Sequence, residues 1–330
     1  ALGRRGLLQL SFPMEYGFVT NWTDMEAVWR YALDAVAPPD TPPDHDGTRS
    51  QRPHSQRPVL VTEPPLNPRL SRERMAAIMF ERFGVPAFYV ANYAVLALYA
   101  AGLTSGLVLS SNEGVTFAVP VHEGYALPHA IVRSDLSGRS VTEYLTRLLN
   151  EAGHSLTTAE DVEAVQGIRD QLAYVATDFA AELVSANATS AAVKLPDGRT
   201  INVGAERFRA PELLFDPSLV GSREHGIHDM CAAALARCDA DLRAEMYANI
   251  VLAGSNTLFD GLDARLEKEL RALTTEDVHV HIVAPPQRKY TAWLGGSILA
   301  SLSAFEGLWI HREEYDTGGP SIVHSKAPGR

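Results

Sequence analysis

The sequence predicts an α/β fold divided into at least two lobes. Its 330 residues exceed what one hydrophobic core usually holds, because single cores stop growing at roughly 250 to 300 residues. Hydrophobic residues make up 46% of the chain and charged residues 21%, the balance of an ordinary globular protein with a large core. Short apolar runs alternate with amphipathic segments of helical period, a pattern typical of helices packed on a sheet.

The first third of the chain supplies helices, a strand and an insertion. Thr23 and Glu26 match the reciprocal capping pattern, so a helix is expected to begin at Thr23. Residues 59–62 form an apolar run of the kind found in buried parallel strands, and helices are expected over 71–84 and 90–102. Residues 38–57 are rich in Pro, Asp, Ser, Arg and Gln and hold no large apolar side chain, so we expect an exposed, flexible insertion.

The rest of the chain continues the alternation. Hydrophobic period and turn residues predict strands or hairpins within 106–130, 194–203, 250–253 and 278–286, and helices within 137–153, 157–179, 258–273 and 293–305. The hairpin within 194–203 is predicted from its Asp-Gly turn.

Charge and composition exclude several classes of partner. The formal net charge is −11 and no cluster of Lys and Arg stands out, so we expect no nucleic acid partner. The longest apolar runs fall short of the roughly 20 residues that a membrane span needs, and we expect a cytoplasmic protein. Cys231 and Cys238 are too far apart on one expected helix to form a disulfide, which fits a reducing compartment.

Two small polar turns are candidate ligand contacts. Gly254 and Ser255 follow the apolar run 250–253, at the end of a strand where open α/β sheets bind ligands. A plain strand-to-helix connection is the alternative. The turn Ser-Ser-Asn-Glu-Gly, residues 110–114, has hydroxyls and backbone amides that can bind a phosphate. Asn-Glu-Gly is also good turn chemistry without a ligand, and the turn taken alone favours an ordinary hairpin.

No metal site or catalytic motif is predicted. His279 and His281 alternate on one expected strand face, and His228 lies one helical turn from Cys231, but neither pair has a third ligand in the sequence. The common hydrolase and P-loop signatures do not occur.

Segments throughout the chain resemble the actin family, in the family's order. They are TNWTDME, TEPPLNP, MFERFGVPAFYV, EGYALPHAI, KLPDG, ERFRAPE, LFDPS, YANIVLAG, APPQRKY, WLGGSILASL and EYDTGGPSIVH. The resemblance covers nearly the whole chain apart from the insertion, and a bacterial member of the conventional-actin type is one reading of the Ala-, Arg- and Asp-rich substitutions. It implies an actin-like (ribonuclease-H-like) two-lobed ATPase fold with an incomplete first lobe.

The resemblance also implies subdomains. Residues 1–100 and 291–330 correspond to subdomain 1, residues 101–136 and 223–290 to subdomain 3, and residues 137–222 to subdomain 4. Because the chain opens near the family's RGLL segment, we expect subdomain 2, the first phosphate turn and the docking loop to be absent.

The ligand that the resemblance implies is ATP or ADP with Mg²⁺. Ser110, Ser111 and Gly114 lie in the turn that aligns with the family's second phosphate turn. The positions that align with the family's contacts to ribose or adenine are Gly138, Arg169, Asp170, Gly254, Ser255, Asn256, Phe259 and Lys289. Ser110 stands where actins carry an Asp near the cation, and a neutral hydroxyl is a poor ligand for a hard divalent ion. Asn112 replaces a glycine, and Glu113 replaces a second Asp.

Two further substitutions affect hydrolysis. Tyr93 replaces the family's water-orienting Gln, and Phe117 replaces a nearby His. Neither can position a water for attack on the γ-phosphate. We therefore expect weak or no nucleotide binding, lost ATP hydrolysis, no catalytic residue and no metal ligand.

The predicted role is that of an actin-related cytoskeletal protein acting through protein contacts. Residues 122–129 keep the family's docking socket, whereas Ser222, Arg223 and Glu224 replace apolar packing residues, so ordinary filaments should be weakened. Partners would be actin-like subunits or actin-binding proteins. The alternatives are an ATP-binding, filament-forming actin whose first segment is missing from this sequence, and a decaying copy without function.

Overall fold

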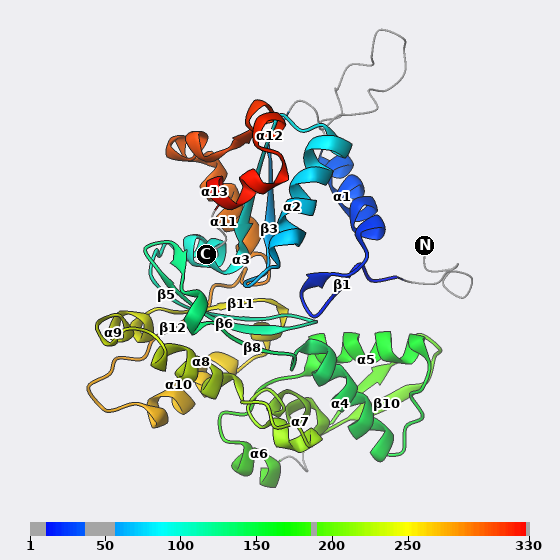
Figure 1. Ribbon diagram of the computed structural model, residues 1–330. Helices are drawn as coiled ribbons and strands as arrows, with labels where there is room; N and C mark the ends of the chain where they lie inside the picture. Colours follow the sequence, from blue (N-terminus) through cyan, green and yellow to red (C-terminus); the bar gives the residue numbers. More distant parts are fainter. Residues whose placement is uncertain (1–10, 37–56, 186–189, 328–330) are drawn as a thin grey trace. The chain divides into compact units, whose positions relative to one another are not determined.

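The computed structural model describes residues 11–36, 57–185 and 190–327 (Figure 1). Residues 38–56 of the predicted insertion therefore lie outside the described part. The chain forms two compact units, unit 1 from residues 1–93 and 296–330 and unit 2 from residues 94–295. The divisions fall inside two helices, α3 (Tyr93–Ala100) and α11 (Thr291–Ser301).

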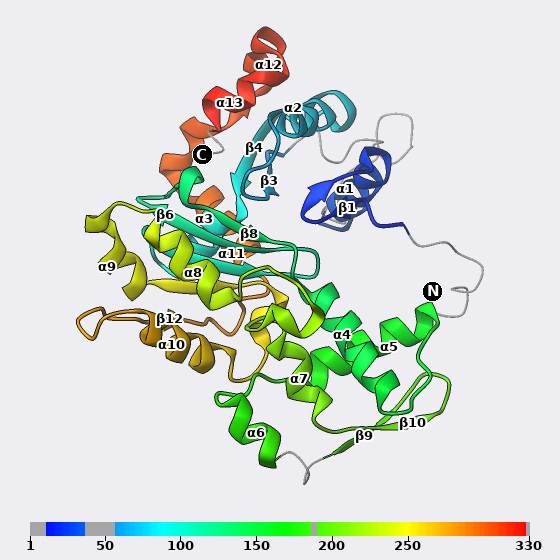
Figure 2. The same ribbon diagram turned by 60° about the horizontal axis from the view of Figure 1, so that its bottom comes forward.

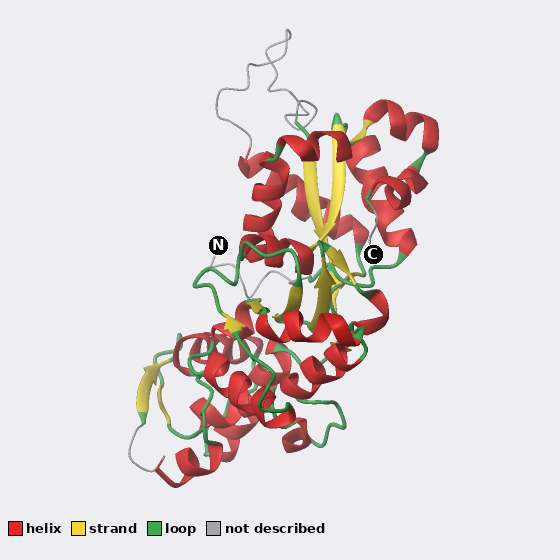
Figure 3. Cartoon of the chain, turned by 90° about the vertical axis from the view of Figure 1, so that its left-hand side faces the viewer, coloured by secondary structure: helices red, strands yellow, loops and turns green. Residues whose placement is uncertain are grey.

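Unit 1 is built on a three-stranded sheet. Strand β4 (Ala87–Asn92) lies at its centre, parallel to β3 (Val59–Glu63) and antiparallel to β13 (Ile310–His311). Helices pack against this sheet (Figure 3). They include α1 (Trp22–Val36), α2 (Arg69–Ala77), a π-helical turn (Ile78–Phe83), α12 (Arg312–Gly318) and α13 (Val323–Lys326), and a small hairpin of β1 (Met14–Glu15) and β2 (Phe18–Val19) precedes α1.

Aromatic side chains fill the core of unit 1. Phe80 packs edge-on against Phe88 and stacks on Tyr315, whose ring centroid is 4.4 Å away. All three are buried. The contacts join the π-helical turn, the central strand and α12 around one core.

Unit 2 is built on a six-stranded mixed sheet. Strands β12 (Ile282–Val283), β11 (Ile250–Ala253) and β5 (Gly106–Ser111) are parallel, and β6 (Thr116–His122) returns antiparallel to β5. Strands β7 (Tyr125–Ala126) and β8 (Val132–Ser134) both pair with β6. The carboxyl end of β5 therefore feeds directly into a hairpin turn.

Helices α8 (Ile227–Ala236) and α10 (Leu262–Leu273) lie side by side against this sheet, next to α9 (Ala240–Ala248) (Figure 2). The rest of unit 2 comprises α4 (Gly138–Glu151), α5 (Ala159–Leu172), α6 (Phe179–Ser185), α7 (Glu206–Glu212) and the hairpin of β9 (Ala191–Lys194) and β10 (Thr200–Val203). One core cluster runs from the sheet into α4 and α5.

The structure confirms both predicted hairpins and corrects four local predictions. Helix α1 begins at Trp22, and the side chain of Asn21 accepts the backbone N–H of Asp24, so Asn21 caps it in place of Thr23. The segment predicted as a helix from residue 90 begins with the end of strand β4. The predicted strand 278–286 is reduced to Ile282–Val283, and the long helix expected over 157–179 ends at Leu172.

No helix among the described residues is long and apolar enough to cross a membrane.

Candidate functional site

The β5–β6 turn is a closed hairpin turn at the edge of unit 2's core. Ser110 pairs with Phe117 and Ser111 with Thr116 in the antiparallel ladder. The backbone N–H of Asn112 then donates to the carbonyl of Val115 over 3.2 Å, which closes the turn. Ser110 and Ser111 are each 1% exposed, so the two hydroxyls belong to the interior.

The polar side chains of this turn bind one another. Asn112 Nδ2 donates to Ser110 Oγ over 3.0 Å, and the hydroxyls of Ser111 and Thr116 are 2.8 Å apart. Thr116 also donates to the carbonyl of Leu136. A divalent cation prefers charged oxygen ligands, and Ser110 Oγ is a neutral, buried hydroxyl that already accepts one hydrogen bond. Ser110 therefore supplies no charged ligand for Mg²⁺ at this turn.

The N-terminus of α4 packs directly on the turn. The backbone N–H groups of Gly138 and Arg139 donate to the carbonyls of Asn112 and Glu113 over 2.9 and 3.0 Å. The hydroxyl of Ser137 also donates to Glu113 O. Amides at a helix N-terminus are the groups that usually bind phosphate. Here the first two amides are already occupied by the protein's own turn.

The loop after β11 closes the site from a third side. Gly254 has a φ of +91°, and a Cβ there would lie 2.3 Å from Ser111 O, so only glycine permits this approach. Asn256 Nδ2 donates to Asn112 O over 2.7 Å and to Ser111 Oγ over 3.2 Å. The loop therefore packs tightly on the 110–114 turn, as expected for a strand-to-helix connection in which glycine permits close packing.

A buried guanidinium, that of Arg169 on α5, completes this cluster. Its side chain is 2% exposed. Nη1 donates to Glu113 Oε2 at 2.8 Å, Gly138 O at 2.6 Å and Thr142 Oγ1 at 2.8 Å. Nε and Nη2 both donate to Asp170 Oδ1. The charge of Arg169 is thus neutralised by two carboxylates of the same chain.

The structure brings most of the predicted site residues together. Ser110, Ser111, Gly138, Arg169, Asp170, Gly254 and Asn256 belong to this one cluster, and Gly114 lies half-buried in its turn. Ser255 lies next to Asn256 and is half-buried. Phe259 is buried in the core of unit 2, and Lys289 is exposed beside the ring of Tyr290.

Sequence reasoning missed three participants. Ser137 and Thr142 hold Glu113 O and Arg169 in place, and Thr116 pairs with Ser111. Ser137 directly precedes α4, but its hydroxyl donates to Glu113 O and makes no cap bond to the helix, so the capping pattern would not have indicated this contact. Thr142 and Arg169 lie on different helices, so no local pattern indicates their contact.

The histidine pairs do not form a metal centre. The rings of His279 and His281 stack with centroids 6.2 Å apart, and His228 stacks on Phe215. Within 11–36, 57–185 and 190–327, no three His, Cys, Asp or Glu side chains are grouped to hold a metal ion.

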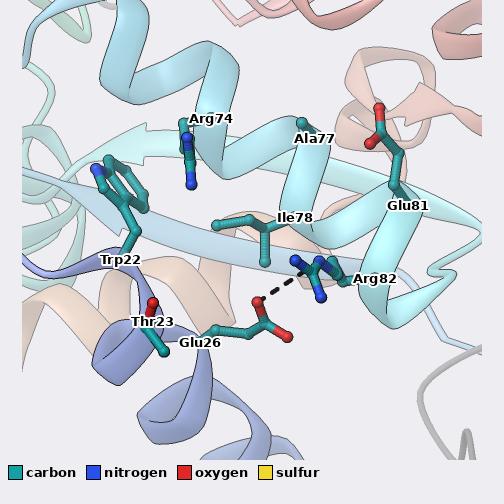
Figure 4. Close-up of a pocket in the computed structure, with 8 residues that line it drawn as sticks. All are labelled: Trp22, Thr23, Glu26, Arg74, Ala77, Ile78, Glu81 and Arg82. Atoms are coloured by element: carbon teal, nitrogen blue, oxygen red, sulfur yellow. Dashed lines mark ion pairs between the residues drawn. The ribbon is translucent and has the colours of Figure 1, made fainter.

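Unit 1 carries a separate pocket of about 280 Å³ between α1 and α2 (Figure 4). The guanidinium of Arg74 lies over the ring of Trp22, 5.8 Å from its centroid. Across the pocket Glu26 and Arg82 form a loose ion pair at 3.8 Å. The pocket is lined by two arginines, Arg74 and Arg82, and by two glutamates, Glu26 and Glu81. Its charge therefore indicates neither an anionic nor a cationic ligand.

Comparison with known proteins identifies the family. The sequence model of the actin family matches residues 1–328. An "Actin-like protein" of Neurospora crassa is 44% identical over 328 residues, which cover 98% of this chain and 83% of the relative. The two-unit α/β architecture agrees with the actin-like fold that the resemblance implied. The chain belongs to the actin family.

Proposed function

We propose that this actin-family protein acts through contacts with other proteins, binds nucleotide weakly or not at all, and does not hydrolyse ATP. Its partners would be actin-like subunits or actin-binding proteins of the cytoskeleton. The ATP- and Mg²⁺-dependent chemistry of the family would then be dispensable for its role.

The single observation that carries this proposal is the closed hydrogen-bond network of the β5–β6 turn. Ser110 Oγ accepts a hydrogen bond from Asn112 Nδ2. The backbone amides at the start of α4 donate to the carbonyls of the turn. A phosphate would have to displace these bonds, and each displaced bond costs free energy that the ligand must regain. Phe117, opposite Ser110, is fully buried and cannot orient a water.

The second candidate is an ATP-binding, filament-forming actin. The observation that favours it is the close packing of Gly254 and Asn256 on the turn, because it preserves the arrangement of loop and hairpin that a nucleotide would need. Under this reading Asn112 and Glu113 would rearrange when ATP binds.

Titration of the purified protein with fluorescent ATP and Mg²⁺, followed by phosphate-release and pelleting assays, separates the two candidates. Our proposal expects no binding at micromolar protein, no phosphate release above the protein-free rate, and no nucleotide-dependent pelleting. Micromolar affinity with phosphate release would overturn it in favour of the second candidate. Authentic actin run in parallel controls for active nucleotide and buffer.

A further inference from the structure

The groove between α1 and α2 has one end that combines an aromatic ring with a cation. The guanidinium of Arg74 lies over the indole of Trp22, 5.8 Å from the ring centroid (Figure 4). The buried side chain of Ile78 lies between this pair and the ion pair of Glu26 and Arg82. Tryptophan and arginine beside a pocket are the residues that most often dominate the affinity of a protein interface. This end of the groove therefore has the composition of a protein contact.

The charges that line the groove are equal in number but differ in their partners. Glu26 is paired with two arginines, since its carboxylate oxygens lie 3.1 Å from Arg30 Nη2 and 3.8 Å from Arg82 Nε. The carboxylate of Glu81 accepts the hydroxyl of Tyr315 over 2.6 Å. Both glutamates of the lining thus already have partners within unit 1.

Arg74 is the lining charge whose partner is not a charged group. It is exposed, and among residues 11–36, 57–185 and 190–327 no carboxylate forms an ion pair with it. Its contact with Trp22 is electrostatic attraction to the ring face, which uses none of the five N–H donors of a guanidinium. A carboxylate that enters the groove can therefore bind Arg74 without displacing another carboxylate.

Apolar side chains lie one helical turn before and after Arg74. Leu70, four residues before it, is 78% exposed, and Ile78, four residues after it, lines the groove. Four residues of a helix span about 6 Å, and a partner helix presents its side chains at i and i+4 with the same spacing. The groove walls are helices whose backbone groups bond within each helix, so recognition depends on side chains, as when a helix binds in a groove.

From these contacts we infer that the groove between α1 and α2 binds an acidic amphipathic helix of a partner protein. A carboxylate of that helix binds Arg74, and an apolar side chain one turn away packs on Ile78. This inference rests on the proposed function, which it deepens by naming the chemistry of one protein partner. A basic helix would meet Arg74 with like charge and would have to displace Arg30 and Arg82 from Glu26.

The test uses a fluorescein-labelled, alanine-based helical peptide that carries Glu and Leu four residues apart. Matched peptides carry Gln or Lys in place of the Glu, and fluorescence polarisation with the purified full chain measures their affinities. We expect the Glu peptide to bind about tenfold more tightly than the Gln peptide, the factor that one charge-assisted hydrogen bond supplies, and the Lys peptide to bind most weakly. Equal affinities, or a preference for Lys, would overturn the inference.

Variants of the protein locate the contact. Arg74→Met should remove the preference for the Glu peptide, and Arg74→Glu should reverse it in favour of the Lys peptide. Arg69→Met is the matched control, because Arg69 is an exposed arginine of the same helix that does not line the groove. Circular dichroism first establishes that each variant is folded. A preference for Glu that survives both Arg74 variants would place the contact elsewhere and overturn the inference.

Hydrogen exchange gives a readout that does not depend on substitution. Saturation with the Glu peptide should slow exchange within 22–26 and 74–82 and leave α10, in unit 2, at its original rate. Slowing confined to unit 2 would contradict a groove site.

The two proposals fail in different ways. Tight nucleotide binding with phosphate release by the wild-type protein overturns the proposed function, whatever the peptides do. A chain that binds no nucleotide and shows no preference for the Glu peptide overturns only the inference about the groove.

Discussion

The guanidinium of Arg199, in the β9–β10 hairpin, lies 2.7 Å from the carboxylate of Asp161 in the first turn of α5. Asp161 also accepts hydrogen bonds from the backbone N–H and the hydroxyl of Thr158, and Thr158 in turn accepts the N–H of Asp161. One carboxylate thus caps a helix and ties a hairpin to it. The bonds from Thr158, with those from Thr157 and Arg199, lower the pKa of Asp161 to about 2.

Asp161→Asn should destabilise the protein at neutral pH, and the deficit should vanish in acid. The pKa of Asp161 in the folded protein is below the unfolded value of about 3.9, so its contribution is present above about pH 4 and is lost as the pH falls toward 2. Urea denaturation of wild type and variant between pH 2 and pH 7 measures this. Glu160 is an exposed neighbour in the same helical turn. The difference in unfolding free energy between Glu160→Gln and wild type should therefore not shrink as the pH falls.

Arg265→Met should cost about 3 to 5 kcal/mol at neutral pH, because it leaves the buried carboxylate of Glu212 without its partner. The two guanidinium nitrogens of Arg265 lie 2.9 and 3.1 Å from the two oxygens of Glu212. Arg271→Met on the same helix is the control, since it breaks only an exposed pair with Glu267 and should cost less than about 1 kcal/mol.

The Arg265→Met deficit should shrink in acid. Burial raises the pKa of Glu212 above its ordinary value even with Arg265 present. When the pKa of a carboxyl group is higher in the folded than in the unfolded protein, protonation stabilises the fold. That stabilisation is present below the unfolded-state pKa of about 4.3 and is lost as the pH rises through the folded-state pKa. Without Arg265 the pKa rises further, so denaturation at pH 4 should show a smaller difference from wild type than at pH 7. A constant difference would contradict this account.

Arg72→Met should loosen the end of unit 1. Arg72 is buried beside Glu63 and donates from Nη2 to the carbonyl of Ala327, which follows α13. Removing the guanidinium breaks that anchor and leaves the buried Glu63 carboxylate without a cation, with only the amide of Asn67 as hydrogen-bond donor. Hydrogen exchange should therefore rise at least about tenfold in residues 323–327, equivalent to about 1.4 kcal/mol, and stay unchanged in α10. Arg69→Met, an exposed arginine of α2, should leave both regions at the wild-type rate.

Gly254→Ala should destabilise far more than Gly153→Ala, although both glycines have positive φ. Gly153 has φ +98° and no atom within 4 Å of the place where a Cβ would lie, so alanine there should cost only the backbone strain of about 1 to 2 kcal/mol. Gly254, at φ +91° and ψ +161°, lies in a backbone region that is essentially confined to glycine, and a Cβ there would also meet the carbonyl of Ser111 at 2.3 Å. Thermal unfolding of the two variants measures the difference, and equal losses would show that the loop and the turn are not closely packed.

Both cysteine thiols should be unreactive until the protein unfolds. Cys231 is fully buried and burial raises its pKa to about 12, while burial also raises the pKa of Cys238. The thiolate is the reactive form, so a chromogenic disulfide reagent at pH 8 should label neither cysteine in the folded protein and both in denaturant. Rapid labelling of the native protein would contradict the buried placement.

Elements with strong local signals were predictable from the sequence. The Asp-Gly turn placed the β9–β10 hairpin, and the polar turn at 110–114 placed the β5–β6 hairpin. The strand predicted at 278–286 failed for a tertiary reason. Its partner β11 starts at Ile250, which pairs with Ile282, so the alternating residues before Ile282 have no strand beside them. Strand β4 was missed because only its last residue, Asn92, separates its apolar residues from α3, and periodicity does not distinguish strand from helix in such short apolar runs.

The residues of the candidate site could be predicted from the sequence, but the contacts between them could not. The resemblance to actins named the turn, the loop at Gly254 and the pair Arg169 and Asp170 from aligned positions. The ion pair between Glu113 and Arg169 joins residues on a turn and a helix far apart in sequence. This ion pair depends on how α5 packs beside α4. A side-chain contact between two separate elements produces no periodic pattern in the sequence of either one.

The internal hydrogen bonds of the β5–β6 turn bear on whether the stability of this protein depends on a bound ligand. A protein whose fold is completed by a bound molecule gains stability with the concentration of that molecule, and loses it when supply falls. Here Asn112, Asn256 and the first amides of α4 already satisfy the turn from within. Under the proposed function, the stability of the folded chain should therefore not depend on the ATP concentration around it.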